Sequence, residues 1–114
     1  MLRATEAAPQ APENPARLFA ALGDENRLRL VDQLCEGGPM SASRLTSGLS
    51  ISRQAVTKHL LRLEGAGLVR SRRRGRERLW QIEPPRLDEA QRYLEMISAQ
   101  WDTAIERLRG FVEG

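Results

Sequence analysis

The chain has little cysteine and no long apolar run, and each of these absences excludes a class of protein. A single cysteine, Cys35, cannot form an internal disulfide, so a disulfide-stabilised scaffold is excluded. No apolar run approaches the roughly 18 residues of a membrane-spanning helix, and residues 1–14 lack the apolar core of a secretory signal. We therefore expect a cytoplasmic protein without a membrane partner. The 114 residues suffice for one domain with one hydrophobic core.

The residues that enzymes use for catalysis are equally sparse. His59 is the only histidine, and no other imidazole could activate a serine or cysteine nucleophile. The segment EGAGLV at residues 64–69 closes a predicted helix instead of following a strand, so it is not a dinucleotide-binding motif. We therefore predict a protein that is not an enzyme and that needs no cofactor.

Charge is plentiful and unevenly distributed. The formal net charge of the whole chain is only +3. Residues 1–43 carry a net charge of −2, residues 44–86 a net charge of +8 and residues 87–114 a net charge of −3. A basic centre between acidic flanks favours the binding of a polyanion, and the simpler alternative is an arginine-rich face that is merely solvated.

Capping residues and apolar spacing divide the first half of the chain into helices. Residues 1–13, rich in alanine and proline, predict a disordered arm ahead of one domain over residues 14–114. Four helices follow, each preceded by a residue that can accept a hydrogen bond from the first free backbone N–H groups. The predicted helix starts are Asn14 with Pro15, Asp24, Ser41 and Ser52.

After the fourth helix the apolar period changes from 3.6 to 2, which is typical of strands. Residues 68–73 and 78–82 predict a hairpin, and Pro84-Pro85 end its second strand. Residues 87–112 predict a long helix with an apolar stripe along one side. This order predicts a mainly α protein of the winged helix-turn-helix class, with about five helices and a two-stranded β-hairpin wing.

The predicted fourth helix has the side chains of a helix that reads DNA. Its apolar residues share one face, which leaves Gln54 and Lys58 on the opposite face near the N-terminus. Glutamine can pair with adenine, lysine can reach the acceptors of guanine, and the methyl groups of Ala55 and Thr57 can contact thymine. The other candidate DNA contacts on the two helices, mainly to phosphates, are Ser41, Ser52, Arg53 and Arg62.

The predicted hairpin concentrates arginine around a single glycine. Five guanidinium groups on a two-stranded ribbon repel one another unless an anion lies nearby, and a DNA backbone or narrow minor groove supplies one. The helix and the hairpin together predict binding to double-stranded DNA. The five wing residues are Arg72, Arg73, Arg74, Arg76 and Arg78.

Three segments resemble bacterial winged-helix repressors of the ArsR/SmtB type. They are LFAALGDENRLRLVDQL from Leu18, ISRQAVTKHLLRLEGAGLV from Ile51 and RRRGRERLWQI from Arg72. The resemblance implies a transcriptional regulator, a repressor that binds an inverted-repeat operator as a homodimer. It also implies that the first and last helices form the dimer interface. The interface candidates are Leu18, Phe19, Leu22, Leu94, Ile97, Trp101, Ile105 and Leu108.

Many proteins of that family sense metals, but this sequence lacks their ligands. Ser41-Ala42-Ser43 stands where arsenic-type members have Cys-Val-Cys, and the last predicted helix has none of the histidines of zinc-type members. We therefore predict no metal site, and no effector is indicated. Cys35 is predicted to be a buried, inert thiol on the apolar side of the second helix. His59 is predicted to pack or to form a hydrogen bond at the margin of the core.

Two other classes of protein stay open at this point. A nucleic-acid-binding protein without sequence preference, such as an architectural protein, would keep its affinity when Gln54 and Lys58 are replaced. A protein-interaction module that uses the long helix would bind no double-stranded DNA even at low salt.

Overall fold

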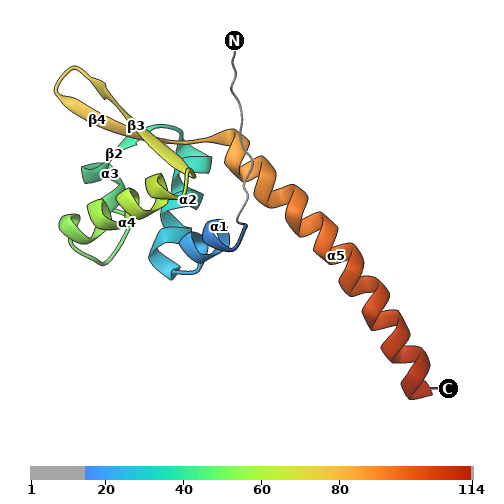
Figure 1. Cartoon of the computed structure of the whole chain (residues 1–114). Helices are drawn as coiled ribbons and strands as arrows, with labels where there is room; N and C mark the ends of the chain where they lie inside the picture. Colours follow the sequence, from blue (N-terminus) through green and yellow to red (C-terminus); the bar gives the residue numbers. More distant parts are fainter. Residues whose placement is uncertain (1–14, 114) are drawn as a thin grey trace, which may run out of the picture.

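The computed structural model describes residues 15–113, which form five helices and a three-stranded antiparallel sheet. Figure 1 shows the first four helices packed as one body, a hairpin projecting from it and the last helix leaving it on the other side. The mainly α, winged arrangement is as predicted; the arm over residues 1–13 and the cap at Asn14 lie outside the described residues. In chain order the elements are α1 (Pro15–Leu22), α2 (Glu25–Gly37), β2 (Met40–Ser41), α3 (Ala42–Thr46), α4 (Arg53–Gly65), β3 (Val69–Arg74), β4 (Glu77–Ile82) and α5 (Pro84–Glu113).

The helices of the body start where the capping residues predict. The Asp24 carboxylate accepts hydrogen bonds from the backbone N–H groups of Asn26 at 2.8 Å and Arg27 at 3.1 Å. Ser41 caps α3, and Ser52 caps α4 by accepting from the Ala55 N–H at 3.1 Å. Each cap satisfies a donor that has no partner inside its helix.

A left-handed glycine ends α4 and turns the chain into the sheet. Gly67 has φ +80°, and the N–H of Leu68 donates to the carbonyl of Leu63 at 3.0 Å. A Cβ at Gly67 would lie 2.6 Å from Nε of Arg86, so both backbone conformation and space favour glycine here. The turn fixes the direction in which the hairpin leaves α4.

The core lies between α2, α3, α4 and the base of the sheet. Leu30, Leu45, Val56, Leu60 and Leu63 are completely buried, which confirms the predicted inner face of α4. Trp80 of β4 closes the core from the sheet side with only 2% of its surface exposed. Because α4 gives its whole apolar face to this core, its opposite face is held toward solvent.

The sheet contains one strand that the sequence does not predict. β2 pairs with β4, placing Met40 opposite Trp80 and Ser41 opposite Leu79. The strand order is β2-β4-β3. Two residues are too few to produce a period of 2, and the pairing is non-local, so local patterning could not reveal this strand. It ties the start of α3 to the base of the wing.

The long helix begins three residues earlier than predicted. α5 starts at Pro84, so Pro84-Pro85 form the first helical turn instead of preceding the helix. The N–H groups at a helix start have no partner inside the helix, so prolines are tolerated there. At 1.5 Å per residue its 30 residues span about 45 Å.

Asp24, the N-cap of α2, should make the stability of the protein sensitive to acid. The hydrogen bond from the Arg27 backbone N–H, with help from that of Asn26 and the charges of His59 and Arg27, holds the pKa of Asp24 below its usual value despite some desolvation. A carboxyl whose pKa is lowered by folding stabilises the protein fully above the unfolded pKa of about 3.9. That stability is lost as the pH falls through the lower pKa of the folded state.

We therefore expect the free energy of unfolding to fall more steeply as the pH is lowered in the wild type than in the Asp24→Asn variant. Asparagine is also a good N-cap but does not titrate, so the variant keeps the cap and loses only the pH-dependent part. Urea unfolding between pH 6 and about pH 3 measures the difference. Parallel pH profiles for the two proteins would contradict the assignment.

Candidate nucleic-acid interface

The face of α4 opposite the core carries the two side chains predicted to read bases. Gln54 and Lys58 are exposed, and Ala55 and Thr57 are half-buried on the flanks. The Ser52 hydroxyl accepts from the backbone of α4, so its oxygen is used as a cap while its proton stays free to be donated. Arg53 is exposed in the first turn. The structure thus places the predicted reading residues on one accessible surface.

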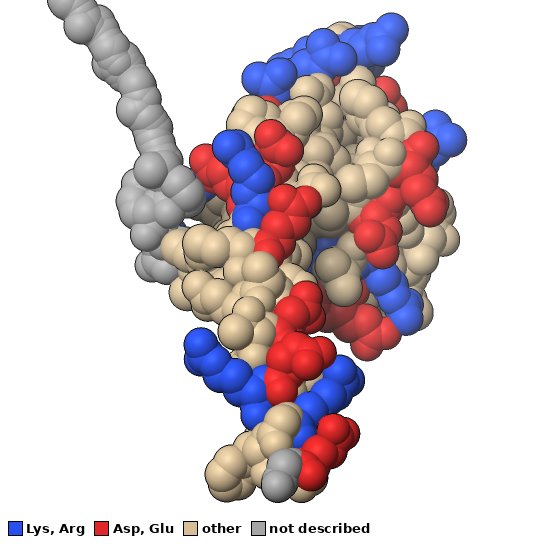
Figure 2. Space-filling model, turned by 90° about the vertical axis from the view of Figure 1, so that its right-hand side faces the viewer, with Lys and Arg blue, Asp and Glu red and all other residues tan. Residues whose placement is uncertain are grey.

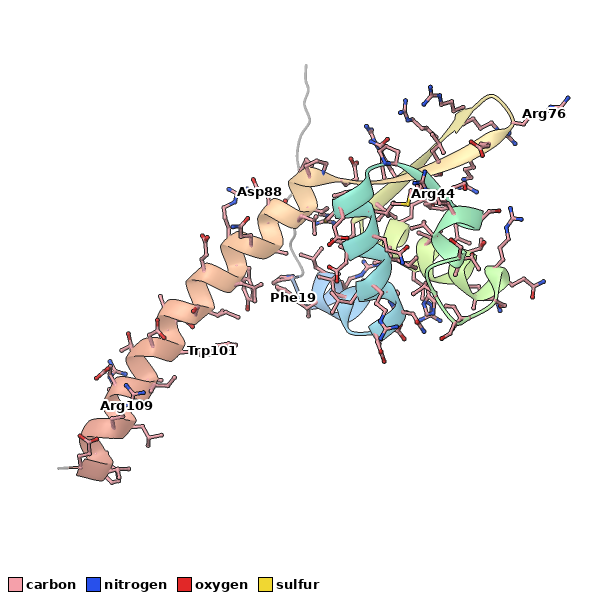
Figure 3. All side chains as sticks on the ribbon, turned by 180° about the vertical axis from the view of Figure 1, so that it is seen from behind. Phe19, Arg44, Arg76, Asp88, Trp101 and Arg109 are labelled. Carbon is pink, nitrogen blue, oxygen red and sulfur yellow. The ribbon has the colours of Figure 1, made fainter. Side chains whose placement is uncertain are left out.

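Residues of α3 precede this helix and lie against the sheet. Ser41 accepts a hydrogen bond from the Arg44 backbone N–H at 3.2 Å. Leu45 is buried and anchors α3, whereas Ser43 and Arg44 are exposed (Figure 3 labels Arg44). Two helices joined by residues 47–52 form a helix-turn-helix, with α4 as its second helix.

The wing is a tight hairpin whose tip is almost entirely basic. β3 and β4 are joined through Gly75 and Arg76, and Gly75 has φ +65°. Arg73 lies directly opposite Arg78, so two like charges face each other across the strands. Arg78 is fixed by a hydrogen bond from its Nε to Ser71 Oγ at 2.8 Å and by the ring of Trp80, 4.6 Å away.

Most of the basic side chains in the centre of the chain have no ionic partner. Of the eleven between residues 44 and 86, only Arg70 with Glu83 at 3.4 Å and Arg86 with Glu89 at 3.0 Å form ion pairs within the described residues. Figure 2 shows basic side chains in a band along the top of the molecule, where Figure 1 has the wing. Unpaired like charges held this close together favour a polyanionic partner. The unpaired residues are Arg44, Arg53, Lys58, Arg62, Arg72, Arg73, Arg74, Arg76 and Arg78.

A hollow of about 320 Å³ connects the helix-turn-helix with the wing. It brings together five predicted residues from β2, α4, β4 and the turn between β3 and β4. It adds Ser43 and Trp80, which the sequence did not single out for this surface. A phosphate of a DNA backbone is small enough to enter it, with Arg53 and Arg76 among its walls. The lining residues are Ser41, Ala42, Ser43, Arg53, Thr57, Arg76, Glu77, Arg78 and Trp80.

The predicted dimer residues divide into two groups. Leu18 is buried in the core of its own subunit, which leaves little of its surface for a partner. Phe19 packs on Tyr93 of α5 with ring centroids 5.7 Å apart, and Leu22 and Ile97 are half-buried. The other four stripe residues, Leu94, Trp101, Ile105 and Leu108, are exposed on α5.

Within the part of the chain that the structure describes, nothing covers the apolar stripe on the outer part of α5. Trp101 is 59% exposed and Leu108 is 62% exposed. Figure 3 shows Trp101 projecting from the side of α5 that is turned toward the body, across open space. A continuous exposed apolar face of this kind is rare on a monomer and marks an interaction surface.

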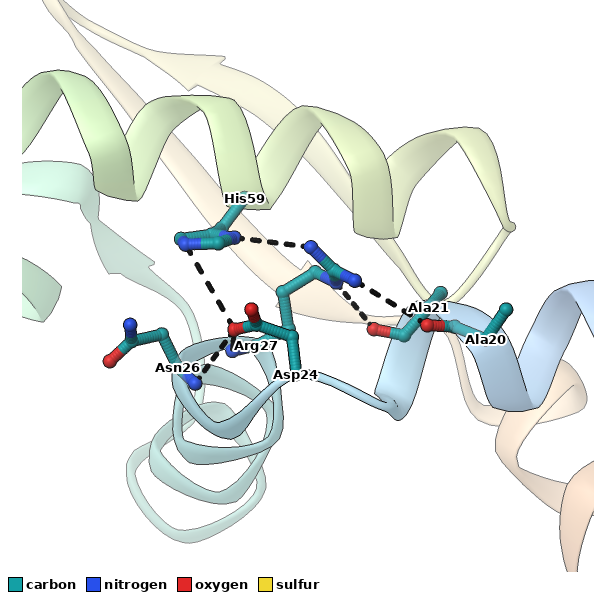
Figure 4. A network of polar contacts seen from close by, with 6 residues as sticks. All are labelled: Ala20, Ala21, Asp24, Asn26, Arg27 and His59. Atoms are coloured by element: carbon teal, nitrogen blue, oxygen red, sulfur yellow. Dashed lines mark hydrogen bonds and ion pairs between the residues drawn. The ribbon is translucent and has the colours of Figure 1, made fainter.

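His59 joins α4 to the start of α2. Its Nδ1 lies 3.3 Å from Nη1 of Arg27, and its Nε2 lies 4.0 Å from Oδ1 of Asp24 (Figure 4). Arg27 in turn donates to the carbonyl of Ala21 at 2.6 Å. These contacts confirm the predicted hydrogen-bonding role of His59, and they connect three helices at one point.

The predicted burial of Cys35 is wrong. The buried arc of α2 is centred on Leu30, Val31 and Leu34, and Cys35 lies beyond its edge, where the thiol is exposed. Partial desolvation, together with the negative charges of Asp32 and Glu36, raises the pKa of the thiol. Thus the thiol stays protonated and poorly nucleophilic at neutral pH, although it is exposed.

Within residues 15–113 no three His, Cys, Asp or Glu side chains lie close enough together to hold a metal ion. No helix in this range is long and apolar enough to cross a membrane.

Sequence and structure comparisons relate the chain to transcription regulators. Residues 22–72 match the family of helix-turn-helix domains. The uncharacterised HTH-type transcriptional regulator YuzN of Bacillus subtilis is 43% identical over 72 residues, covering 58% of this chain and 78% of that protein. The arsenical resistance operon repressor of Escherichia coli is 33% identical over 70 residues, covering 61% of this chain and 60% of that protein.

A solved structure extends the similarity to the three-dimensional fold. The ArsR-like transcriptional regulator from Rhodococcus sp. RHA1 has 38% sequence identity and a TM-score of 0.69. The match covers 85% of this chain and 91% of that chain, so it includes more than the helix-turn-helix.

Proposed function

Because this chain belongs to the ArsR-like winged helix-turn-helix transcriptional regulators, which bind DNA, we propose that it represses transcription as a homodimer on an inverted-repeat operator. In this proposal each subunit places α4 in a major groove and its wing along the adjacent backbone or minor groove. The two recognition helices lie about one DNA turn apart, roughly 34 Å. The protein works in the cytoplasm, where it meets the chromosome.

The observation that carries the proposal is the position of Gln54 and Lys58. Both are exposed on the outer face of α4, in a helix whose inner face is anchored by three completely buried residues. Arg53 and Arg76 line one hollow between this helix and the wing. The arrangement supports base contacts by the helix and phosphate contacts by its surroundings.

We expect Gln54→Ala with Lys58→Ala to reduce the preference for operator over random DNA. Each good base contact contributes about 1–3 kcal/mol of discrimination, so losing both should lower the specificity ratio by at least about 30-fold. Selection of bound genomic fragments supplies the operator, and fluorescence anisotropy with operator and scrambled duplexes at fixed salt measures the ratio.

The matched control for this experiment is Leu61→Ala with Glu64→Ala. These two changes alter the same helix nearer its C-terminus, on residues that are not predicted to touch bases. An unchanged specificity ratio in the Gln54 and Lys58 variant would favour binding without sequence preference. No binding of any duplex by the wild type at low salt would favour a protein-interaction module instead.

The arsenical resistance in the name of the Escherichia coli relative is not carried over to this chain. Ser41-Ala42-Ser43 offers hydroxyl groups where a thiolate site needs sulfur, and the Ser41 oxygen already caps α3. The proposal therefore includes no response to a thiophilic metal.

A further inference from the structure

A second hollow lies where the C-terminal ends of α1 and α4 meet. It has a volume of about 290 Å³, and its lining includes Arg17 of α1, Arg27 of α2 and Arg62 of α4. Among the described residues, no acidic side chain lines it. The remaining walls are small, so three guanidinium groups from three helices line a space wide enough for a tetrahedral anion. The small residues are Ala20, Ala21, Gly65 and Ala66.

The arginines of this hollow retain free hydrogen-bond donors. Neither Arg17 nor Arg62 forms an ion pair within residues 15–113. Arg27 donates to the carbonyls of Ala21 and Ala20 and approaches His59 Nδ1 at 3.3 Å. A guanidinium group has five N–H donors, so two remain on Arg27 after these three contacts.

The negative C-terminal ends of α1 and α4 cancel only part of the positive charge of the three arginines. Each helix C-terminus carries the equivalent of about half a negative charge. The carbonyls concerned already have partners: Ala20 accepts from Gly23 as well as Arg27, and Arg62 accepts from the Ala66 N–H at 3.2 Å. The Asp24 carboxylate, which interacts with Arg27 through its charge, cancels a further part. Three full positive charges still exceed one full and two partial negative ones, which leaves a net attraction for anions.

We propose that these three arginines form a binding site for a phosphate group. Arg27 presents its remaining donors from a side chain fixed by α1, and Arg17 and Arg62 supply mobile charges from either side. Because Arg27 also holds His59, a phosphate in the hollow acts directly on the helix that carries Gln54 and Lys58. The group belongs either to a free small molecule, which would regulate operator binding, or to the DNA backbone.

The first arm of the test uses inorganic phosphate and no DNA. Phosphate replaces chloride at constant ionic strength while the Arg27 Nε–H signal is followed by NMR in the wild type, Arg17→Gln and Arg107→Gln. Arg107 is an exposed arginine of α5 outside the hollow, so its variant removes the same charge elsewhere. We expect saturable binding that Arg17→Gln weakens about tenfold or more and Arg107→Gln leaves unchanged.

The second arm tests whether the phosphate comes from the DNA backbone, and it rests on the proposed function. If the phosphate belongs to the DNA backbone, Arg17→Gln lowers the slope of log affinity for the operator against log salt by about 1. Arg107→Gln then leaves this slope unchanged. A regulatory free phosphate would instead change operator affinity at constant ionic strength, and Arg17→Gln would remove that response.

The inference is overturned if Arg17→Gln behaves as Arg107→Gln does in both arms. Failure of the wild type to bind any operator would overturn the proposed function and leave the first arm to decide on the phosphate site. The two proposals can therefore fail separately.

Discussion

We expect Trp101→Arg to convert the proposed dimer into monomers and to weaken binding to the proposed operator as a result. Trp101 is 59% exposed on α5, and its neighbours along the stripe, Leu94, Ile105 and Leu108, are between 46% and 62% exposed. A second copy of the chain is the partner that the proposed two-fold arrangement supplies for this face. The substitution places a charge in the middle of that apolar surface.

The expected effect is large because a symmetric interface contains the residue twice. A central tryptophan in an interface commonly contributes 2 kcal/mol or more, so two copies correspond to at least about 10³-fold in the dimer dissociation constant. A monomer keeps only one recognition helix and one wing, so its operator affinity should fall toward that for random DNA. Sedimentation velocity at micromolar concentration measures the first effect and anisotropy the second.

The control is Thr103→Arg, which adds the same charge two residues further along α5. Thr103 is exposed on the face opposite the stripe, and its hydroxyl bonds only to the Ala99 carbonyl of its own helix. It should stay dimeric and bind the operator normally. The body's core lies outside this part of α5, so both variants should keep its fold, which thermal unfolding can check. A dimeric Trp101→Arg protein would contradict the assignment of the interface.

The elements predicted correctly from the sequence are those set by local interactions. Asp24, Ser41 and Ser52 bind backbone N–H groups two or three residues away, so their identity and position suffice to place three helix starts. The exposed face of α4 is likewise predicted by its period, since the opposite face is buried. These features depend on neighbours within one or two turns.

The features that the sequence did not predict depend on the rest of the fold. Met40 and Ser41 become a strand only because β4 returns beside them. Cys35 follows the apolar spacing of α2, yet it is exposed, as is Leu28 seven residues earlier, because no element covers that edge of the helix. The hollow formed by Arg17, Arg27 and Arg62 joins residues up to 45 positions apart. Periodicity identifies which residues share a face, but not which part of the face is covered.

The second large effect is expected from replacing the arginines of the wing. Replacing Arg73, Arg74 and Arg76 by glutamine should weaken binding to operator and random DNA alike, because these side chains are proposed to contact phosphates. Each lost phosphate contact lowers the slope of log affinity against log salt by about 0.9, so the slope should fall by nearly 3. At about 0.1 M salt this corresponds to a loss of roughly 10²–10³-fold in affinity.

Removing the same number of charges outside the wing should have little effect on the slope of log affinity against log salt. Arg29, Arg107 and Arg109 are exposed arginines outside the basic centre, so their triple replacement by glutamine matches the change in net charge. In the wing, by contrast, removing Arg73 also relieves its repulsion with Arg78 across the strands, so the free protein should become no less stable. Loss of DNA affinity without loss of stability separates a binding role from a folding role. Equal salt slopes for the two triple variants would contradict the wing's contact with phosphates, because net charge alone would then explain the binding.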